Sequence, residues 1–233
     1  MAPVLAGECG KTPEEILAAV DRNLQPESYE AYRRLVNIEP DGRKKEFVLY
    51  SAKKGREQVV ALFLEPASEK GRATLRKGDN MWLYIPNVGK PLRITSLQSV
   101  TGGIFNNSDI LRLDYSEEYK VEKSEDKAGA VILHLKAKTK SVAYDKLKMW
   151  VDIEKLMPTK IECYAATGLL IKTLRFKEVK DFGNKIVRPA VVETDSPLHK
   201  GYKSIMIFGQ ITPREFEDEV FTINFLSRVG TLR

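Results

Sequence analysis

Side chains that could do acid–base or metal chemistry are scarce in this chain. The sequence holds two histidines, His134 and His199. Neither has a partner at a metal-binding spacing such as H-E-x-x-H, and His134 alternates with lysines in a segment that predicts a surface strand. No serine stands in the G-x-S-x-G turn that exposes a nucleophile. The sequence therefore predicts no catalytic residue, no metal site and no enzymatic activity.

Four carboxylates gather in the middle of the chain, at Asp109, Asp114, Glu117 and Glu118. Two neighbouring carboxylates can exchange protons with a substrate when an apolar pocket raises the pKa of one of them. Charged residues in long connections more often lie in water. We therefore expect these side chains to belong to a solvated loop.

The chain has two cysteines, Cys9 and Cys163. They show no C-x-x-C spacing and no nearby histidine, which argues against a zinc site. Cys163 lies between Glu162 and Tyr164 in an alternating segment, so we expect it to pack inward as a small apolar residue. The sequence does not decide whether Cys9 and Cys163 form a disulfide.

Two large classes of function lack their sequence signals. Neither G-x-x-x-x-G-K-[ST] nor G-x-G-x-x-G occurs, so no nucleotide cofactor is expected. No apolar run reaches the ~18 residues of a transmembrane helix.

The net charge is +6, from 38 Lys and Arg against 32 Asp and Glu. The basic residues are spread over many segments, which fits a solvated positive face or attraction to anionic lipid headgroups or an acidic partner. A basic β-barrel that binds nucleic acid is a further alternative. Trp82 and Tyr84 stand in the most apolar stretch of the chain rather than a basic one, so nucleic acid is not the expected partner.

The N-terminus carries a short processing signal. Val4-x-Ala6 has the small-residue spacing that signal peptidase accepts. We interpret residues 1–6 as a signal-peptide remnant or engineered residues, with an ordinary cytosolic start as the alternative. Residues 7–233 contain no linker or repeat and are expected to form a single domain.

Residues 12–24 carry the signals of one amphipathic helix. Thr12 can cap it, Pro13 suits its first position, and Glu15 completes a capping box. Its apolar side chains recur on one face and must cover something apolar. This stripe consists of Ile16, Leu17, Val20 and Leu24.

The rest of the chain reads mainly as strands separated by turns, the pattern of an antiparallel meander. Pro40-Asp41-Gly42 predicts a hairpin between strands 28–39 and 43–53. We expect a mainly β protein (α+β by content) with about eleven strands in one large curved antiparallel sheet or open barrel. The other predicted strands are 56–65, 72–77, 80–86, 91–96, 131–138, 144–154, 159–165, 169–180, 185–194 and 201–211.

The predicted strand 80–86 contains five large apolar or amphipathic residues in a row. A strand with one face in water alternates apolar with polar residues, and this one does not, so both of its faces need cover. Either two cores meet there, or one face belongs to a core and the other lines an apolar cavity. Met81, Leu83 and Ile85 share one face, and Trp82 and Tyr84 share the other.

Residues 97–116 interrupt the strands. Connections of this length are often functional. Ser108 or Asn107 could cap a short helix in this segment. That helix would carry Ile110, Leu111 and Leu113.

Several short motifs occur in the order and spacing of a known family. Phe63-Leu64-Glu65-Pro66 is similar to its F-x-x-P, and residues 81–86 look like its W-L-Y-x-P signature. Residues 107–115, N-S-D-I-L-R-L-D-Y, resemble the segment that follows. On these motifs the chain resembles the LolA-like family of periplasmic outer-membrane lipoprotein-sorting proteins.

The resemblance implies a half-open antiparallel β-barrel with a helical lid over an apolar interior that receives lipoprotein acyl chains. It also implies a periplasmic location, an inner-membrane ABC transporter and an outer-membrane acceptor. The leading hypothesis is a periplasmic carrier or chaperone that shelters the acyl chains of lipoproteins or other lipids on their way to the outer membrane. A module of the same fold that senses a lipid or protein without ferrying it is the alternative. We expect a monomer.

The candidate site residues are apolar side chains, and the alternative is that all of them fill a dry core. A continuous cavity of several hundred Å³ would support lipid binding, whereas a filled interior would contradict both lipid hypotheses, the carrier and the sensor. The lid candidates are Ile16, Leu17, Val20, Ile110, Leu111 and Leu113. The cavity candidates are Phe47, Leu49, Phe63, Met81, Trp82, Leu83, Tyr84, Ile85, Leu174 and Phe176.

Overall fold

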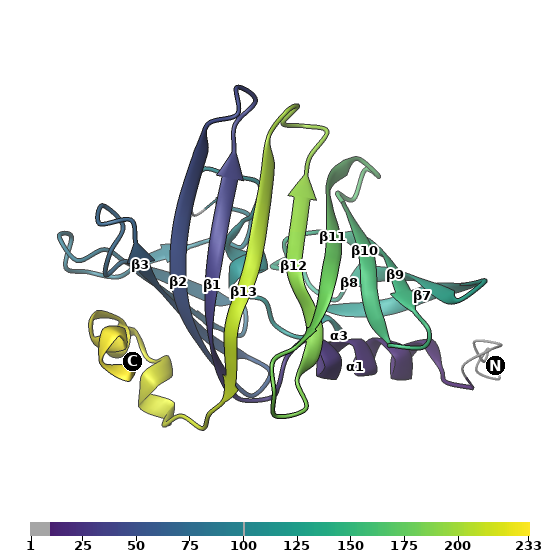
Figure 1. Ribbon diagram of the computed structural model, residues 1–233, viewed down its shortest axis with the longest axis horizontal. Helices are drawn as coiled ribbons and strands as arrows, with labels where there is room; N and C mark the ends of the chain where they lie inside the picture. Colours follow the sequence, from purple (N-terminus) through teal and green to yellow (C-terminus); the bar gives the residue numbers. More distant parts are fainter. Residues whose placement is uncertain (1–9, 100) are drawn as a thin grey trace.

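The computed structural model describes residues 10–99 and 101–233 (Figure 1). They form one sheet of thirteen antiparallel strands in the order β6-β5-β4-β3-β2-β1-β13-β12-β11-β10-β9-β8-β7. Figure 1 shows the sheet strongly curved, with α1 lying across one end of its hollow side. The strands are β1 Tyr29–Ile38, β2 Lys44–Lys54, β3 Gln58–Glu65, β4 Ala73–Lys77, β5 Asn80–Tyr84, β6 Leu92–Ile94, β7 Tyr119–Lys127, β8 Ala130–Ala137, β9 Lys146–Asp152, β10 Met157–Tyr164, β11 Leu170–Asp181, β12 Val187–Asp195 and β13 Lys203–Pro213.

The helices are few. Within the described part of the chain, no helix is both long and apolar enough to cross a membrane. The α-helices are α1 Pro13–Leu24, α2 Asn107–Ile110 and α3 Tyr115–Glu118, and two 3-10 helices follow the sheet, η1 Asp218–Phe221 and η2 Ile223–Leu232.

The connectivity of the sheet leaves its barrel open. β1 pairs with β13, and every other pair of neighbouring strands is consecutive in the chain. The two edge strands β6 and β7 also follow each other in sequence, but they lie at opposite ends of the sheet. The segment between them, which contains α2 and α3, therefore has to cross from one edge to the other. The opening of the half-barrel is spanned by the chain that joins its edges.

The predicted curved antiparallel sheet is confirmed, with thirteen strands rather than about eleven. The strand that the sequence pattern missed is β7, whose nine residues read Y-K-V-E-K-S-E-D-K. β7 is an edge strand that pairs with β8 alone and exposes many of its side chains. Charged edge strands are common because they discourage pairing with other chains, and they show little apolar alternation.

Helix α1 begins and ends where its local signals predict. The Thr12 hydroxyl accepts from the Glu15 backbone N–H at 3.2 Å, and the Glu15 carboxylate accepts from the Thr12 N–H at 2.7 Å. This reciprocal capping box satisfies two backbone donors at the start of the helix. The buried stripe of α1 includes all four predicted residues, Ile16, Leu17, Val20 and Leu24.

Two apolar clusters lie on opposite faces of the sheet. The inner cluster fills the hollow side, where strand side chains pack against α1, α2 and α3. The outer cluster lies on the other face of β2–β4, beneath the C-terminal 3-10 helices. The chain after β13 thus covers strand surface that would otherwise expose a large apolar patch. The outer cluster is built around Tyr50, Leu62, Leu75, Phe216, Phe221 and Leu226.

Strand β5 lies where these two clusters meet. Met81 belongs to the inner cluster, whereas Trp82 and Tyr84 pack against the outer cluster. The alternative of two cores on either side of one strand therefore applies to β5. Leu83 and Ile85 are half-buried and lie outside both clusters.

Candidate functional site

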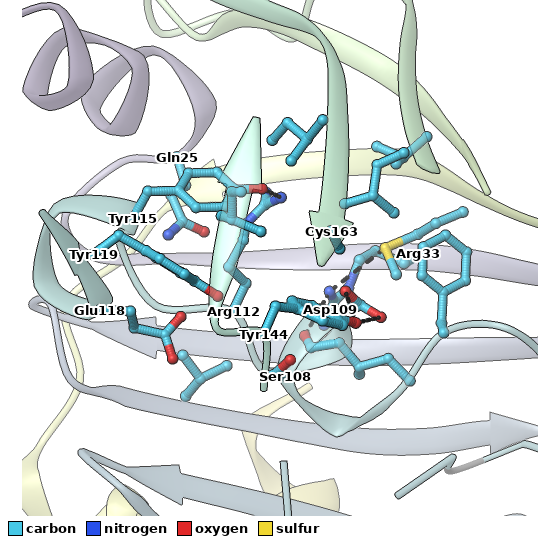
Figure 2. Close-up of a pocket in the computed structure, with 18 of the residues that line it drawn as sticks. Gln25, Arg33, Ser108, Asp109, Arg112, Tyr115, Glu118, Tyr119, Tyr144 and Cys163 are labelled. Carbon is cyan, nitrogen blue, oxygen red and sulfur yellow. Dashed lines mark hydrogen bonds between the residues drawn. The ribbon is translucent and has the colours of Figure 1, made fainter. Parts of the chain in front are cut away.

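The hollow side of the sheet is filled rather than empty. The space that remains between the wall and its helical cover is about 40 Å³, far below the ~300–1,000 Å³ typical of ligand sites. The continuous cavity of several hundred Å³ that would support lipid binding is therefore not found among the described residues, and the filled interior counts against lipid binding in this closed state. The filling comes from residues 104–118, here called the lid, and from α1. Figure 2 shows lid and wall side chains around this space, among them Arg33, Asp109 and Tyr144.

The first turn of the lid is held by a polar cluster around Asp109. The Asn106 side chain caps α2, and the Asp109 carboxylate accepts from the Asn106 N–H at 2.9 Å. The Tyr144 hydroxyl accepts from the Asn106 side-chain amide at 2.7 Å. Lys172, from β11, forms an ion pair with Asp109, and both side chains are at least 90 % buried. A short helix exists where predicted, although Asn106 is its cap rather than Asn107 or Ser108. Of the three apolar residues that this helix was predicted to carry, only Ile110 lies in α2, because the helix ends there.

Two arginines of the wall bind backbone carbonyls at the end of α2. The guanidinium of Arg33, on β1, donates to the Ile110 carbonyl at 2.9 Å. The guanidinium of Arg76, on β4, donates to the Leu111 carbonyl at 3.3 Å. Cations interact favourably with the carbonyl groups at a helix C-terminus. These contacts fix the position of the lid at its middle.

The second half of the lid is held by two more buried ion pairs. The Lys53 ammonium lies 2.8 Å from the Asp114 carboxylate. The Arg76 guanidinium lies 2.5 Å from the Glu118 carboxylate. Both cations are 2 % exposed at the side chain, and the two acids are 15 % and 10 % exposed. Water therefore screens these pairs much less than it screens surface pairs.

The acidic group in the middle of the chain is thus not a solvated loop, contrary to our expectation. Asp109, Asp114 and Glu118 point at cations of the wall. Glu117 alone behaves as expected, because its pair with Arg56 lies at the surface. The partners are 42, 61 and 63 residues away along the chain, so no local pattern could have shown the pairing.

Helix α1 is tied to the lid through a buried carboxylate. Asp21 accepts the backbone N–H of Tyr115 at 2.7 Å and that of Ser116 at 2.9 Å, which caps the start of α3. Burial raises the pKa of Asp21 to about 6, and the hydrogen bonds from Ser116 and Tyr115 oppose this rise. The sequence offered no signal for this role, since Asp21 sits among the apolar residues of a helix.

Two buried guanidiniums have no carboxylate partner among the described residues, Arg33 and Arg188. Arg188, on β12, is 0 % exposed and donates to the carbonyl of Leu24 at the end of α1. Its Nη2 atom has no hydrogen-bond partner in the described part of the chain. Both arginines lie against the ring of Phe208. The distance from the guanidinium Cζ to the ring centroid is 3.9 Å for Arg188 and 5.9 Å for Arg33. Burial lowers the pKa of Arg188 to about 9 and that of Arg33 to about 10, so both remain charged at neutral pH.

Cys163 lines the remaining space but is not activated. It is 0 % exposed, as the alternating pattern predicts, and burial raises the pKa of its thiol. A thiol held protonated is a poor nucleophile. Cys9 and residues 1–6 lie outside the described residues. In the described ranges, no group of three or more His, Cys, Asp and Glu is placed to hold a metal ion.

The predicted apolar site residues fall into three groups. Phe47, Leu49, Phe63, Met81, Leu174 and Phe176 face the interior, as do all six lid candidates, Ile16, Leu17, Val20, Ile110, Leu111 and Leu113. Trp82 and Tyr84 lie on the opposite face of the sheet, and Leu83 and Ile85 are partly exposed. The structure therefore places six of the ten cavity candidates on the interior face of the sheet, beneath the lid.

Comparison with known proteins places this architecture. Residues 55–228 match a protein-family model described as "-like: Uncharacterized protein". The structure resembles that of a LolA superfamily protein from Nitrosomonas europaea, with a TM-score of 0.83 and 28 % sequence identity over 92 % of this chain and 99 % of that one. The chain belongs to the LolA-like family.

Two further solved structures share the fold of this LolA-like chain at lower identity. A putative outer membrane lipoprotein-sorting protein domain from Vibrio parahaemolyticus has a TM-score of 0.76 and 22 % identity over 92 % of this chain and 98 % of its own. A DUF1329 family protein from Desulfovibrio piger has a TM-score of 0.77 and 20 % identity over 97 % and 100 %. None of the curated proteins shows significant sequence similarity to this chain.

Proposed function

We propose that this protein is a periplasmic carrier that shelters the acyl chains of lipoproteins or other lipids during transport toward the outer membrane. One observation carries the proposal. The apolar wall of the half-barrel is covered by a separate helical segment, not by the sheet closing on itself. Because the interior of the closed state is filled, lipid can bind only after this cover leaves, and a cover of this kind can leave without breaking the hydrogen bonds between strands.

When an acyl chain replaces the lid on the wall, the apolar surface that the chain buries offsets the apolar surface that the lid no longer buries. Each CH₂ of an acyl chain moved from water to an apolar site is worth ~0.8 kcal/mol. In the closed state the same wall is covered by Ile110, Leu111 and Leu113, each no more than 4 % exposed. An acyl chain that replaces these side chains compensates the lost burial. Uptake and release can then both proceed without a large free-energy barrier from solvent exposure.

The proposed partners follow from the direction of transport. An inner-membrane ABC transporter would hand the lipid to this protein, and an outer-membrane acceptor would receive it. The LolA-like fold and the name of the Vibrio parahaemolyticus relative support this assignment.

The decisive experiment is native mass spectrometry of protein purified without detergent, followed by transfer assays between vesicles. We expect co-purified acylated species, and we expect the protein to move labelled lipid from donor to acceptor vesicles. A protein that binds lipid but moves none between vesicles would be a sensor module rather than a carrier. A protein that binds no acylated species under either condition would refute the proposal.

A further inference from the structure

Charges of opposite sign are segregated between the wall and its cover. Among the buried side chains that the structure describes, the strands contribute cations and no carboxylate, and none of these cations is more than 8 % exposed. The carboxylates that face them belong to α1 and the lid. The wall supplies Arg33, Lys53, Arg76, Lys172 and Arg188, and the cover supplies Asp21, Asp109, Asp114 and Glu118 together with one cation, Arg112, which lines the remaining space.

Stability of the closed state does not explain this arrangement. The desolvation of each buried ion costs several kcal/mol, and replacing a buried ion pair by apolar residues of similar size is often neutral or stabilising. A cavity that held neutral acyl chains alone would need no buried cation. The wall nevertheless carries five.

Opening of the lid removes carboxylates that neutralise the cations of the wall. Asp109, Asp114 and Glu118 all belong to the lid, so they leave with it. Lys172, Lys53 and Arg76 then lose the only carboxylate partners that they have among the described residues. The opened interior is an apolar surface whose strands carry five positive charges, against which α1 supplies the one carboxylate of Asp21.

Part of this positive charge is unbalanced even in the closed state. Arg188 has its guanidinium fully buried and its Nη2 donor unpaired among the described residues. Arg33 lies against the same Phe208 ring, at the wall of the remaining space. The Nη2 atom is one of six buried side-chain N and O atoms without a partner among the described residues, and each such group calls for an explanation.

We propose, building on the carrier function above, that the preferred ligand is an amphiphile with a phosphate-bearing, anionic headgroup. The acyl chains take the place of the apolar lid residues, and the headgroup oxygens take the place of the lid carboxylates. Guanidinium groups bind phosphate through paired N–H donors, and ammonium groups bind it as point charges. The lid is thus an internal substitute for the ligand, matched to it in both apolar surface and charge.

The test compares two lipids that share their acyl chains and differ in headgroup charge. The full chain is incubated with vesicles that contain equal amounts of dioleoyl phosphatidylglycerol and dioleoyl phosphatidylcholine, and the lipids bound to it are counted by native mass spectrometry. We expect phosphatidylglycerol to be bound at least about tenfold in excess, the effect of one charge-assisted contact. A parallel arm titrates inorganic phosphate as a competitor.

Two double variants that keep the net charge test whether the preference for phosphatidylglycerol depends on the charges of the inner wall. K172M/D109N removes one ion pair between the wall and the lid, and the asparagine keeps an acceptor for the Asn106 N–H. K177M/E193Q removes an ion pair on the outer face of the same strand, with N and O 2.6 Å apart. We expect the preference for phosphatidylglycerol to fall several-fold in the first variant and to stay unchanged in the second.

The outcomes separate this inference from the carrier function. Equal binding of the two lipids, or an unchanged preference in K172M/D109N, would overturn the anionic-lipid assignment and leave the carrier function standing. Displacement of bound lipid by inorganic phosphate at the same concentrations would also overturn it, because the ligand would then be the free anion. Binding of neither lipid would overturn the carrier function itself.

Discussion

Glu117 and Glu118 are adjacent carboxylates in contrasting surroundings. The Glu118 side chain is 10 % exposed and pairs with the buried Arg76, whereas Glu117 pairs with Arg56, which is 67 % exposed. Burial raises the pKa of Glu118 more than Arg76 lowers it. The two residues therefore form a natural test of how much the buried pairs contribute to the closed structure.

We expect Glu118→Ala to destabilise the protein by about 3 to 5 kcal/mol, because Arg76 is left buried without a counter-charge. The control Glu117→Ala should change the free energy of unfolding only slightly, since surface pairs contribute little. Replacing both members, as in R76M/E118L, should restore most of the loss. Denaturant unfolding measures all three, and equal effects of the two single variants would contradict the pairing described here.

Asp21 gives the protein a pH dependence of predictable sign. Its pKa is raised from 3.8 to about 6 in the folded state, so the folded protein holds this proton more tightly than the unfolded chain does. The resulting stabilisation is complete below about pH 4 and is lost as the pH rises through 6. Relative to Asp21→Asn, the free energy of unfolding of the wild-type protein should fall by about 2 kcal/mol between pH 4 and pH 7. Parallel pH profiles for the two proteins would refute the raised pKa.

At the scale of elements, the lid and the sheet should behave as separate units. The lid is held by side-chain contacts and by a few backbone hydrogen bonds near its two ends, whereas the strands are held by continuous backbone ladders. Segments with few backbone hydrogen bonds to the rest of a protein open at lower free energy than its central strands.

We expect Ile110→Ala to weaken lid docking by about 2 kcal/mol or more, since Ile110 is a lid residue only 2 % exposed and large-to-small changes at buried sites cost this much. Hydrogen exchange in residues 104–118 should become at least roughly thirtyfold faster, while exchange in β12 and β13 stays unchanged. Ile223→Ala is the matched control, because Ile223 is 40 % exposed in the C-terminal segment. Equal acceleration in lid and sheet would mean that they open together.

At the scale of the whole molecule, the two apolar clusters have separate structural roles. The inner cluster lies beneath the lid, and the outer cluster holds the C-terminal helices against β2–β4. A substitution in the outer cluster should therefore lower stability without changing the chemistry of the inner wall.

Phe221→Ala tests this division. Phe221 is 1 % exposed. Its ring packs edge-on against that of Phe216, with the two ring centroids 6.1 Å apart. We expect a loss of about 3 to 5 kcal/mol of stability, together with a red shift in the fluorescence of Trp82, which packs against this cluster. Lipid binding by the folded fraction should be unchanged. A change in lipid preference would show that the two faces of the sheet are coupled.

Features with local causes could be predicted from the sequence. The capping box that starts α1 spans the four residues from Thr12 to Glu15, and the hairpin between β1 and β2 follows from Pro40-Asp41-Gly42, where Gly42 has a φ of 85°. The unbroken apolar run at residues 81–85 predicted cover on both faces of a strand, because side-chain direction alternates within a single strand. Each of these signals depends on neighbours within a few residues.

Features that join distant residues were decided only by the tertiary structure. Whether Asp109 and Asp114 lie in water depends on Lys172 and Lys53, which stand 63 and 61 residues away. Whether the interior is empty depends on how residues 104–118 cross between the two edges of the sheet. The sequence by itself thus determined a curved antiparallel sheet, its helical cover and the apolar side chains between them. The burial and pairing of the charges came from the closure of β1 onto β13 and from the path of the lid, since only these bring the opposite charges within reach of each other.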